Sequence, residues 1–174
     1  DFCLSRGLGD VYKRQRPYIV HTGGANKIRA FHTVVAAAER LRARGIAAPL
    51  VNVGPVDLTG YGAAEAAALE RRAARVDVRS LGRIPYVEAL RWTAHARVGY
   101  LPLEASANNA LGLPNKIFEY FAFGLPVVAT SLRGPVDEIM RETHAGLLVA
   151  PGNGEQHAAA PVSYTHLTLP TILR

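Results

Sequence analysis

The chain has 174 residues, enough for one domain with a hydrophobic core and too few for two ordinary domains. Nearly half of the residues are apolar and a fifth are charged, a composition that excludes a disordered polypeptide. The net charge of +6 does not indicate nucleic-acid binding, because the arginines are scattered among glutamates and no aromatic and basic platform accompanies them. Attraction of the basic chain to phosphates or to an anionic membrane surface stays open.

The cysteine content and the hydropathy pattern limit the kinds of site and the cellular location that the chain can have. The one cysteine, Cys3, excludes an internal disulfide and a cysteine-based zinc site. No apolar run approaches the ~20 residues that cross a bilayer, and residues 1–15 lack the layout of a signal peptide. We therefore expect a cytoplasmic protein, with peripheral contact to the inner face of the membrane as an open alternative.

The two ends of the chain look unlike protein sequence. Residues 10–15, DVYKRQ, can be encoded by gat-gtg-tat-aag-aga-cag. The reverse complement of this string, read after an added cytosine, encodes PVSYTH, residues 161–166. Both strings resemble translated transposon-type sequencing adapters. We therefore interpret residues 1–15 and 161–174 as adapter-derived, which the underlying nucleotide sequence would test, and take residues 16–160 as a domain truncated at both ends.

Between these ends, short apolar runs alternate with longer amphipathic, alanine-rich stretches, which is typical of strands and helices around a parallel sheet. Six strands are predicted, each buried on both faces: 18–22, 49–53, 76–81, 98–102, 126–130 and 146–149. Five helices are predicted between them: 31–44, 63–75, 87–95, 116–123 and 135–141. Gly45 and Gly124 are expected to close the first and fourth helices. Right-handed crossovers then predict a Rossmann-like, doubly wound α/β sheet that binds ligands beyond the carboxyl ends of its strands.

The loop after the first predicted strand, HTGGANKIRAF at 21–31, is a candidate phosphate site. In such a sheet the helix that follows presents unpaired backbone N–H groups and a partial positive charge. Gly23 and Gly24 allow the backbone to approach a ligand closely, and Lys27 and Arg29 can reach an anionic group. Taken alone, the loop is equally well explained as a tight turn with two solvated cations. It lacks the GxGxxG pattern, which argues against a dinucleotide-dependent dehydrogenase.

Residues 101–134 form the most informative segment, LPLEASANNALGLPNKIFEYFAFGLPVVATSLRG. It resembles the nucleotide-sugar site of GT-B glycosyltransferases of the family-4-like group, known as glycosyl transferases group 1, through the pattern P-x-K-x-x-E-Y-x-A-x-G-x-P-V-V-A. The matching residues form one unbroken block: Pro114, Asn115, Lys116, Glu119, Tyr120, Ala122, Gly124, Pro126, Val127, Val128 and Ala129.

The spacing of Lys116 and Glu119 has its own physical meaning. They are i and i+3 at the start of a predicted helix, so their side chains share one face. A carboxylate there can accept hydrogen bonds from ribose hydroxyls, and an ammonium group can neutralise a diphosphate. A surface salt bridge between the two side chains is the structural alternative.

The resemblance spans nearly the whole domain and implies one half of a GT-B fold. It implies a retaining glycosyltransferase of the hexosyltransferase class, which takes a nucleotide-diphosphate sugar as its donor and needs no metal or other cofactor. An N-terminal acceptor domain, absent from this chain, would complete the active site, so we expect the chain by itself to transfer no sugar. Polysaccharide biosynthesis is the pathway class that the family suggests.

The family's site residues can be transferred only where the sequence matches. A basic residue near the end of the first loop commonly contacts the diphosphate, and Arg29 stands there, whereas the earlier family arginine is Gly24 in this chain. Gly82 and Arg83 match the turn expected to meet the nucleobase. Glu119 matches the ribose ligand, and the glutamate that many relatives carry eight positions earlier is replaced here by Leu111.

We therefore expect Arg29 and Lys116 to be the catalytic cations that stabilise the leaving diphosphate. Residues expected to bind the donor are Gly23, Gly24, Gly82, Arg83, Glu104, Asn115 and Glu119. Glu104 and the pair Asn108 and Asn109 either line the sugar pocket or form an exposed polar loop.

Other chemistries find little support in the sequence. The six histidines, interpreted as structural or surface residues, show no metal-ligand spacing: His21, His32, His95, His144, His157 and His166. No serine nucleophile elbow or catalytic cysteine is present. Two alternative functions stay open, namely half of a nucleotide-sugar 2-epimerase of similar architecture and a non-catalytic nucleotide-binding module.

Overall fold

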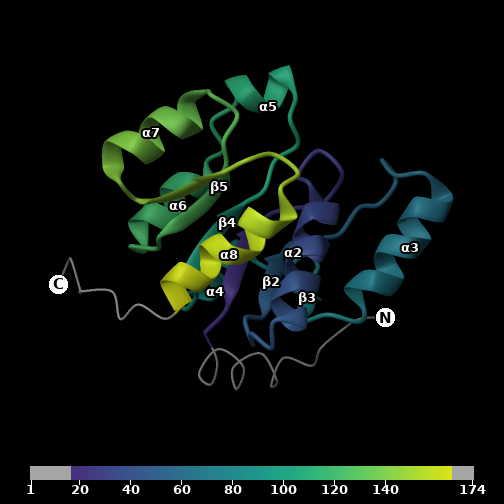
Figure 1. Ribbon diagram of the computed structural model, residues 1–174. Coiled ribbons are helices and arrows are strands. Elements are labelled where there is room, and N and C mark those ends of the chain that lie inside the picture. The colour runs from purple at the N-terminus through teal and green to yellow at the C-terminus, as the bar shows by residue number, and fades with distance from the viewer. Residues whose placement is uncertain (1–16, 166–174) are drawn as a thin grey trace.

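The computed structural model describes residues 17–165 (Figure 1). Cys3, His166 and the suspected adapter-derived residues 1–15 and 166–174 therefore lie outside the described residues. No helix within the described part of the chain combines the length and the apolar character needed to span a bilayer.

All six predicted strands are present and form one parallel sheet in the order β3-β2-β1-β4-β5-β6. Their bounds are β1 Ile19–Thr22, β2 Leu50–Val53, β3 Val78–Ser80, β4 Val98–Leu101, β5 Val127–Thr130 and β6 Gly146–Val149. The chain winds from β1 toward β3, returns to β4 beside β1, and then winds the other way to β6. This confirms the doubly wound, Rossmann-like α/β fold, with its switch point between β1 and β4.

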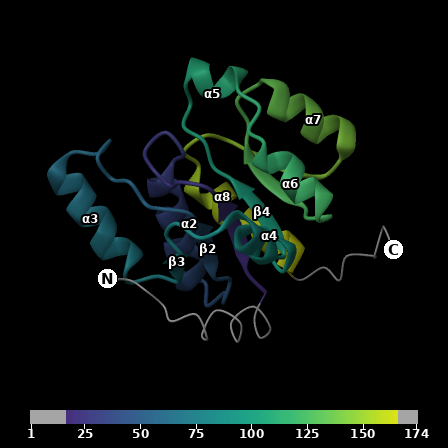
Figure 2. The ribbon, with the colours of Figure 1, turned by 180° about the vertical axis from the view of Figure 1, so that it is seen from behind.

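Helices cover both faces of the sheet, as the two opposite views show (Figures 1 and 2). One face carries α2 Phe31–Ala43, α3 Ala63–Ala73 and α8 Gly154–Thr165, which pack on the first hydrophobic cluster. The other carries α4 Tyr86–Ala94, α6 Lys116–Ala122 and α7 Pro135–Thr143, which pack on the second. Apolar side chains therefore fill both sides of the sheet, as expected for parallel strands.

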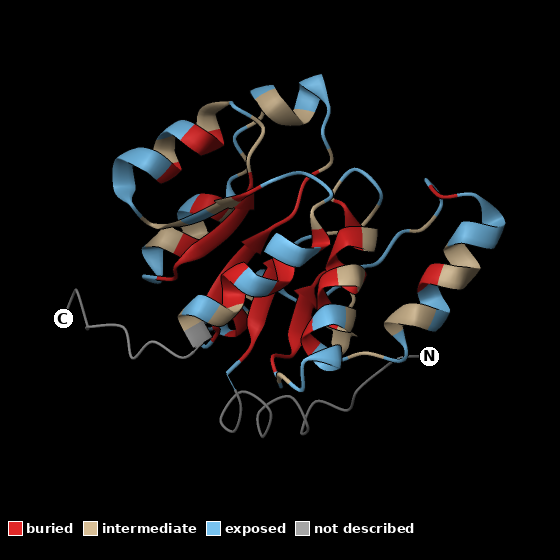
Figure 3. Cartoon of the chain, in the orientation of Figure 1, coloured by how far each residue is buried: buried red, intermediate tan, exposed pale blue. Residues whose placement is uncertain are grey.

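The strands differ in burial more than the sequence predicts. The strands β1, β2, β4 and β5 are buried at every residue and form the centre of the molecule (Figure 3). The prediction that all six are fully buried is wrong for β3 and β6, whose residues are mostly partly exposed. Both lie at the edges of the sheet, where a neighbouring strand is missing on one side.

The five predicted helices are confirmed with ends shifted by up to two residues, and two further helices are present. The five-residue helix α5 Ala107–Leu111 is capped by Ser106, whose Oγ accepts a hydrogen bond from Asn109 N at 3.2 Å. Helix α8 runs past Ala160 into residues 161–165, part of the segment interpreted as adapter-derived. A short polar helix and a helix containing Pro161 carry no clear apolar period, so the sequence does not predict either of them.

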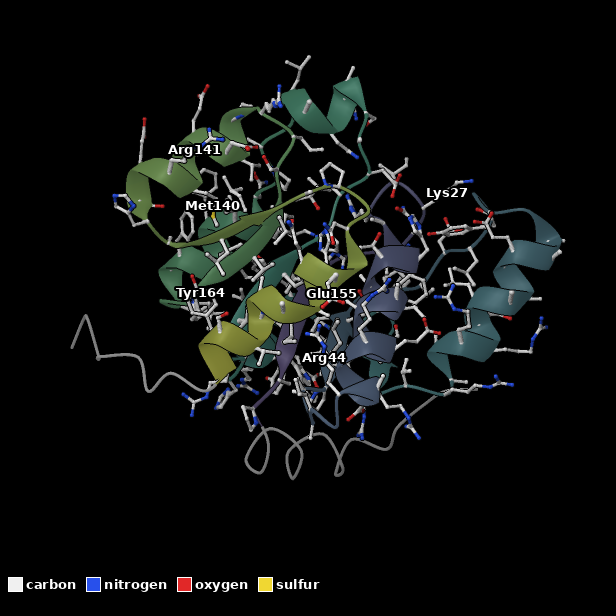
Figure 4. The ribbon with its side chains drawn as sticks, in the orientation of Figure 1. Lys27, Arg44, Met140, Arg141, Glu155 and Tyr164 are labelled. Carbon is white, nitrogen blue, oxygen red and sulfur yellow. The ribbon has the colours of Figure 1, made fainter. Side chains whose placement is uncertain are left out.

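Helix α8 is fastened to α2 and to the sheet. Glu155 of α8 forms ion pairs with Arg40 of α2 and with Arg44, the residue that follows α2, and Figure 4 labels Arg44 and Glu155. In the interior, the hydroxyl oxygen of Tyr100 in β4 lies 2.7 Å from Nδ1 of His157. Burial lowers the pKa of His157 to about 4, so this histidine is neutral at pH 7. The surface pairs add little stability, and the buried packing fixes the helix.

Helix α6 sits on the sheet through a close contact between Tyr120 and Gly99. A Cβ atom on Gly99 would lie 2.5 Å from Cδ2 of the Tyr120 ring, closer than real side chains come. The ring and Gly99 are both buried. Because β4 has no side chain at this point, the aromatic ring packs closely against its backbone, and α6 approaches β1 and β4.

We predict that Gly99→Ala lowers the free energy of unfolding by about 1–3 kcal/mol, because the added methyl group overpacks the Tyr120 contact. Gly62→Ala is the matched control, since Gly62 has an extended backbone and open space around a Cβ. Urea denaturation of both variants measures the difference. Equal stability of the two variants would show that α6 does not depend on this contact.

Candidate functional site

The candidate site lies where the carboxyl ends of β1 and β4 meet the start of α6. At this switch point, the connections leaving β1 and β4 run in opposite directions across the sheet. Open parallel sheets bind ligands at such a point. The predicted residues Gly23, Gly24 and Arg29 follow β1, Glu104 follows β4, and Lys116 begins α6.

The glycine loop after β1 is held by the loop after β2. Gly23 N donates to Val53 O at 2.8 Å, and Ala25 N donates to Pro55 O at 2.9 Å. A Cβ on Gly54 would lie 2.2 Å from Gly23 O, so only glycine allows the two loops to approach this closely. The parallel pairing of β1 and β2 thus continues beyond the sheet, and Gly23 itself stays exposed.

The prediction that the start of α2 presents unpaired backbone N–H groups is wrong. Ala30, in the left-handed conformation with φ of 47°, precedes the helix. Phe31 N donates to Asn26 O at 3.0 Å, His32 N to the Tyr61 hydroxyl at 3.3 Å, and Thr33 N to Ala30 O at 2.8 Å. These first-turn donors of α2 are therefore used inside the protein and are not free to bind an anion.

Lys116 of α6 brings a cation close to the glycine loop. Its Nζ would lie 3.3 Å from a Cβ placed on Gly23. The same Nζ lies 3.1 Å from Nε2 of His21. Burial, followed by the charge of Arg29, lowers the pKa of Lys116 from 10.5 to about 7, while the charge of Glu119 opposes this shift. The start of α6 thus brings Lys116 beside Gly23.

Arg29 lies in the same region, and its guanidinium anchors the loop. Its Nη1 donates to Gly24 O at 3.3 Å, and its backbone N donates to Asn26 Oδ1 at 3.0 Å. Arg29 is partly exposed, and its charge acts on both Lys116 and His21. Two cations from distant parts of the sequence therefore converge beside the exposed Gly23.

His21 contacts Lys116, and Asn52 contacts His21. The His21 ring is buried, and its Nδ1 lies 2.7 Å from Asn52 Oδ1. Asn52 Nδ2 in turn donates to Gly54 O at 2.7 Å. Burial, with the charge of Lys116, lowers the pKa of His21 to about 3, so the ring is neutral. Sequence reasoning treated His21 as structural or surface and missed its contact with Lys116, since no short-range spacing links residues 95 positions apart.

Glu119 forms a second contact of the site, with Tyr86 of α4. The Tyr86 hydroxyl donates to Glu119 Oε1 at 3.1 Å, and this bond raises the pKa of Tyr86. Within the described residues no ion pair joins Lys116 and Glu119, so the salt-bridge alternative is not what the structure shows.

The Gly82–Arg83 turn lies just before α4. Gly82 has a φ of 64°, in the left-handed region that favours glycine, and Arg83 is exposed. Gly82 N donates to Ser80 Oγ at 3.4 Å, and Ser80 Oγ donates to Gly54 O at 2.8 Å. The turn is therefore connected to the glycine loops through Ser80.

The remaining predicted residues are less closely associated with the two cations. Glu104 pairs with His32, with Oε1 3.0 Å from Nε2, and its backbone N donates to Ile28 O at 3.0 Å. Asn109 Nδ2 donates to both Glu104 O at 2.9 Å and Ile28 O at 3.1 Å. Asn115 is exposed at the start of α6, and its side chain does not cap the helix. Glu104 and Asn109 thus hold the far side of the glycine loop.

The Tyr120 hydroxyl ties α6 to the end of β1. Thr22 donates to it through both its backbone N at 3.0 Å and its Oγ1 at 3.1 Å. The same hydroxyl donates a hydrogen bond to Tyr100 O at 3.4 Å. Burial raises the pKa of Tyr120 to about 12, so the phenol keeps its proton. Since Lys116 lies one helical turn before Tyr120, these bonds fix the distance between Lys116 and Gly23.

Other possible sites lie elsewhere or are not seen. Among the described residues, no group of three or more His, Cys, Asp or Glu side chains is arranged to hold a metal ion. A cavity of about 260 Å³ is lined by residues near the ends of α2 and β3, including Leu41, Ile46 and Asp77. It contains none of the predicted site residues.

The comparisons with known proteins agree with this architecture. The sequence model of the family described as Glycosyl transferases group 1 matches residues 16–164. No curated protein sequence gives a significant match.

Three solved structures illustrate the shared fold. HepE of Anabaena with UDP-glucose has a TM-score of 0.66 and 18% identity over 91% of this chain and 42% of its own. The C-terminal domain of LpcC, a glycosyl transferase group 1 protein of Francisella tularensis, has a TM-score of 0.61 and 20% identity. The match covers 90% of this chain and 80% of that domain's chain. A UDP-forming trehalose-phosphate synthase of Burkholderia xenovorans has a TM-score of 0.69 and 20% identity. The match covers 95% of this chain and 39% of the synthase chain. The chain thus spans about two fifths of HepE and of the synthase.

We predict that Tyr120→Phe lowers the free energy of unfolding by about 1–3 kcal/mol, because Thr22 N is left buried without an acceptor. Tyr86→Phe removes the same atom from an exposed side chain and should change stability by less than about 0.5 kcal/mol. Urea denaturation compares the two. Similar losses in both variants would mean that the Tyr120 hydroxyl does not hold α6 in place.

Proposed function

Because the chain belongs to the glycosyl transferases group 1 family, we propose that it is the nucleotide-sugar-binding half of a retaining glycosyltransferase. The observation that carries this proposal is the position of Lys116 Nζ beside the exposed Gly23, with Arg29 acting on the same point. Two cations that meet at the carboxyl ends of parallel strands suit the diphosphate of a nucleotide sugar.

The other parts of the donor fit around this diphosphate. Glu119 stands three residues after Lys116 on the same helix, and Tyr86 occupies only its Oε1. Its carboxylate can therefore accept hydrogen bonds from ribose hydroxyls. The exposed Gly82–Arg83 turn lies before Tyr86, on the side where a nucleobase would extend. HepE was solved with UDP-glucose and the related synthase is UDP-forming, so UDP is the first nucleotide to test.

In this proposal the two cations also assist the reaction. When the bond between the sugar and the diphosphate breaks, negative charge grows on the leaving diphosphate. Arg29 and Lys116 are placed to stabilise that charge, and preorganised groups of this kind lower a barrier more than groups that must reorient. We propose that they act without a metal ion. Retention of configuration and the hexosyl nature of the sugar follow from the family resemblance and belong to the same proposal.

The acceptor would bind to a part of the protein outside this chain. The chain covers 42% of HepE and 39% of the Burkholderia xenovorans synthase, and Gly23 of its candidate site lies on the exposed surface. A second domain facing that surface would exclude water and bring the acceptor to the donor. We therefore propose that the isolated chain binds nucleotide weakly and transfers no sugar; measurable sugar transfer by the isolated chain contradicts this.

We predict that UDP binds the chain with a dissociation constant on the order of 1 mM, about 4 kcal/mol of binding free energy. Amide chemical shifts should move at Gly23, Gly82, Arg83 and Lys116 in an NMR titration. NAD, which requires a GxGxxG loop, is the comparison ligand. Shifts caused by NAD and by neither UDP nor GDP would contradict a nucleotide-sugar site.

Glu119→Ala should weaken UDP binding about tenfold or more, equivalent to ~1.4 kcal/mol, because the ribose loses its acceptor. Its effect on the free energy of unfolding should stay below about 0.5 kcal/mol. Glu142→Ala, which removes an exposed carboxylate from α7, is the charge-matched control. Loss of stability in step with loss of affinity would assign Glu119 a structural role.

A further inference from the structure

The hydrogen bonds around His21 fix which of its nitrogens carries the proton. Asn52 Nδ2 donates to Gly54 O at 2.7 Å and lies 3.4 Å from Ser80 Oγ, so the amide oxygen of Asn52 faces His21. His21 Nδ1 must then donate to Asn52 Oδ1, which is 2.7 Å away. In the neutral ring, Nε2 is left as an acceptor, and the group that lies 3.1 Å from it is Lys116 Nζ.

This arrangement gives Lys116 an acceptor, and its one counter-charge, Glu119, forms no ion pair with it among the described residues. The titratable and charged groups facing it are His21 of β1, Arg29 of the following loop, and Glu119 of its own helix, whose Oε1 accepts from Tyr86 of α4. His21 is neutral and Arg29 repels, so a protonated Lys116 is poorly compensated in the free protein. Burial is the main reason why its pKa falls to about 7.

We propose that His21 is a positioning residue that holds Lys116 Nζ over Gly23, and that a diphosphate binds there together with one proton. The proton is taken up from solvent by Lys116 as the ligand arrives. This inference deepens the proposed function, on which it rests, because it adds a proton to the donor-binding step and names the side chain responsible.

The sign of the effect follows from the charges. Below pH 7 Lys116 is protonated in both the free and the bound protein, so binding takes up no proton. At a pH between 7 and the higher pKa that Lys116 has in the bound protein, Lys116 is mostly neutral in the free protein. A diphosphate bound beside Gly23 and Gly24 favours the ammonium form of Lys116. Binding in this window therefore requires proton uptake, and the affinity falls as the pH rises.

The chain offers a direct observation of this proton. It contains three lysines, Lys13, Lys27 and Lys116, so the ¹³Cε signals of a lysine-labelled sample can be assigned with Lys13→Arg and Lys27→Arg. At pH 8.5 we expect the Lys116 signal of the free protein at the neutral position. Addition of inorganic pyrophosphate, and separately of UDP, should move it to the protonated position. The Lys27 signal, from a half-exposed side chain, serves as the internal reference.

Two variants separate positioning from a structural role. His21→Asn keeps a donor near Asn52 and loses the acceptor for Lys116, whereas His21→Gln keeps an acceptor at the position of Nε2. In His21→Asn, Lys116 should be released to solvent and titrate near the ordinary lysine value of about 10.4. Pyrophosphate binding at pH 7.5 should weaken about tenfold, as expected for loss of one well-placed charged contact. His21→Gln should restore most of the binding and the low titration midpoint.

The outcomes distinguish this inference from the proposed function. If UDP binds without moving the Lys116 signal at pH 8.5, or if both His21 variants bind pyrophosphate like the unmodified chain, the proton-linked role is wrong and the nucleotide-sugar site stands. If pyrophosphate moves the Lys116 signal and UDP binds no more tightly than pyrophosphate, the proton-linked anion site stands and the nucleoside part of the proposed function is wrong. If the signal starts at the protonated position in the free protein, the inference is overturned.

Discussion

The contact between Tyr120 and the backbone of β1 and β4 is the interaction on which the site depends. The ring lies against Gly99, and its hydroxyl accepts two hydrogen bonds from Thr22. One contact thus joins the last residue of β1, the backbone of β4 and the second turn of α6. Lys116 can lie above Gly23 only because this contact places the start of α6 beside the glycine loop. The side chain is buried and neutral, so the link is insensitive to pH over the physiological range.

From this anchor, a set of polar contacts extends across the carboxyl ends of three neighbouring strands. His21 ends near Lys116, Asn52 of β2 orients His21, and Ser80 of β3 lies beside Asn52 and Gly54. Buried polar groups are costly unless each finds a partner, and here each link orients the next. The strand order that places β1, β2 and β3 side by side is therefore also what aligns the donors and acceptors of the site.

Much of this arrangement could be predicted from the sequence. The apolar runs predict all six strands, and the unbroken block around Lys116 predicts both the family and the helix that begins there. The i and i+3 spacing predicts only that Lys116 and Glu119 share one face of that helix. These features are local, or rest on a family pattern, and so can be read along the chain.

The parts that could not be predicted depend on distant contacts or on single backbone angles. His21 and Lys116 are 95 residues apart, and Tyr86 and Glu119 are 33 apart, so neither pairing leaves a periodic signal. The first turn of α2 was expected to offer free donors, but the left-handed Ala30 lets Asn26 and Tyr61 accept two of them. The contact of Glu104 with His32 also joins residues that lie far apart in the chain and leaves no periodic signal.

The closed first turn of α2 has a further consequence. Main-chain N–H groups keep their polarity under all conditions, whereas a lysine ammonium can be discharged. A site that presents Lys116 of α6 and Arg29 of the glycine loop, instead of a helix terminus, therefore has an attraction for anions that varies with pH.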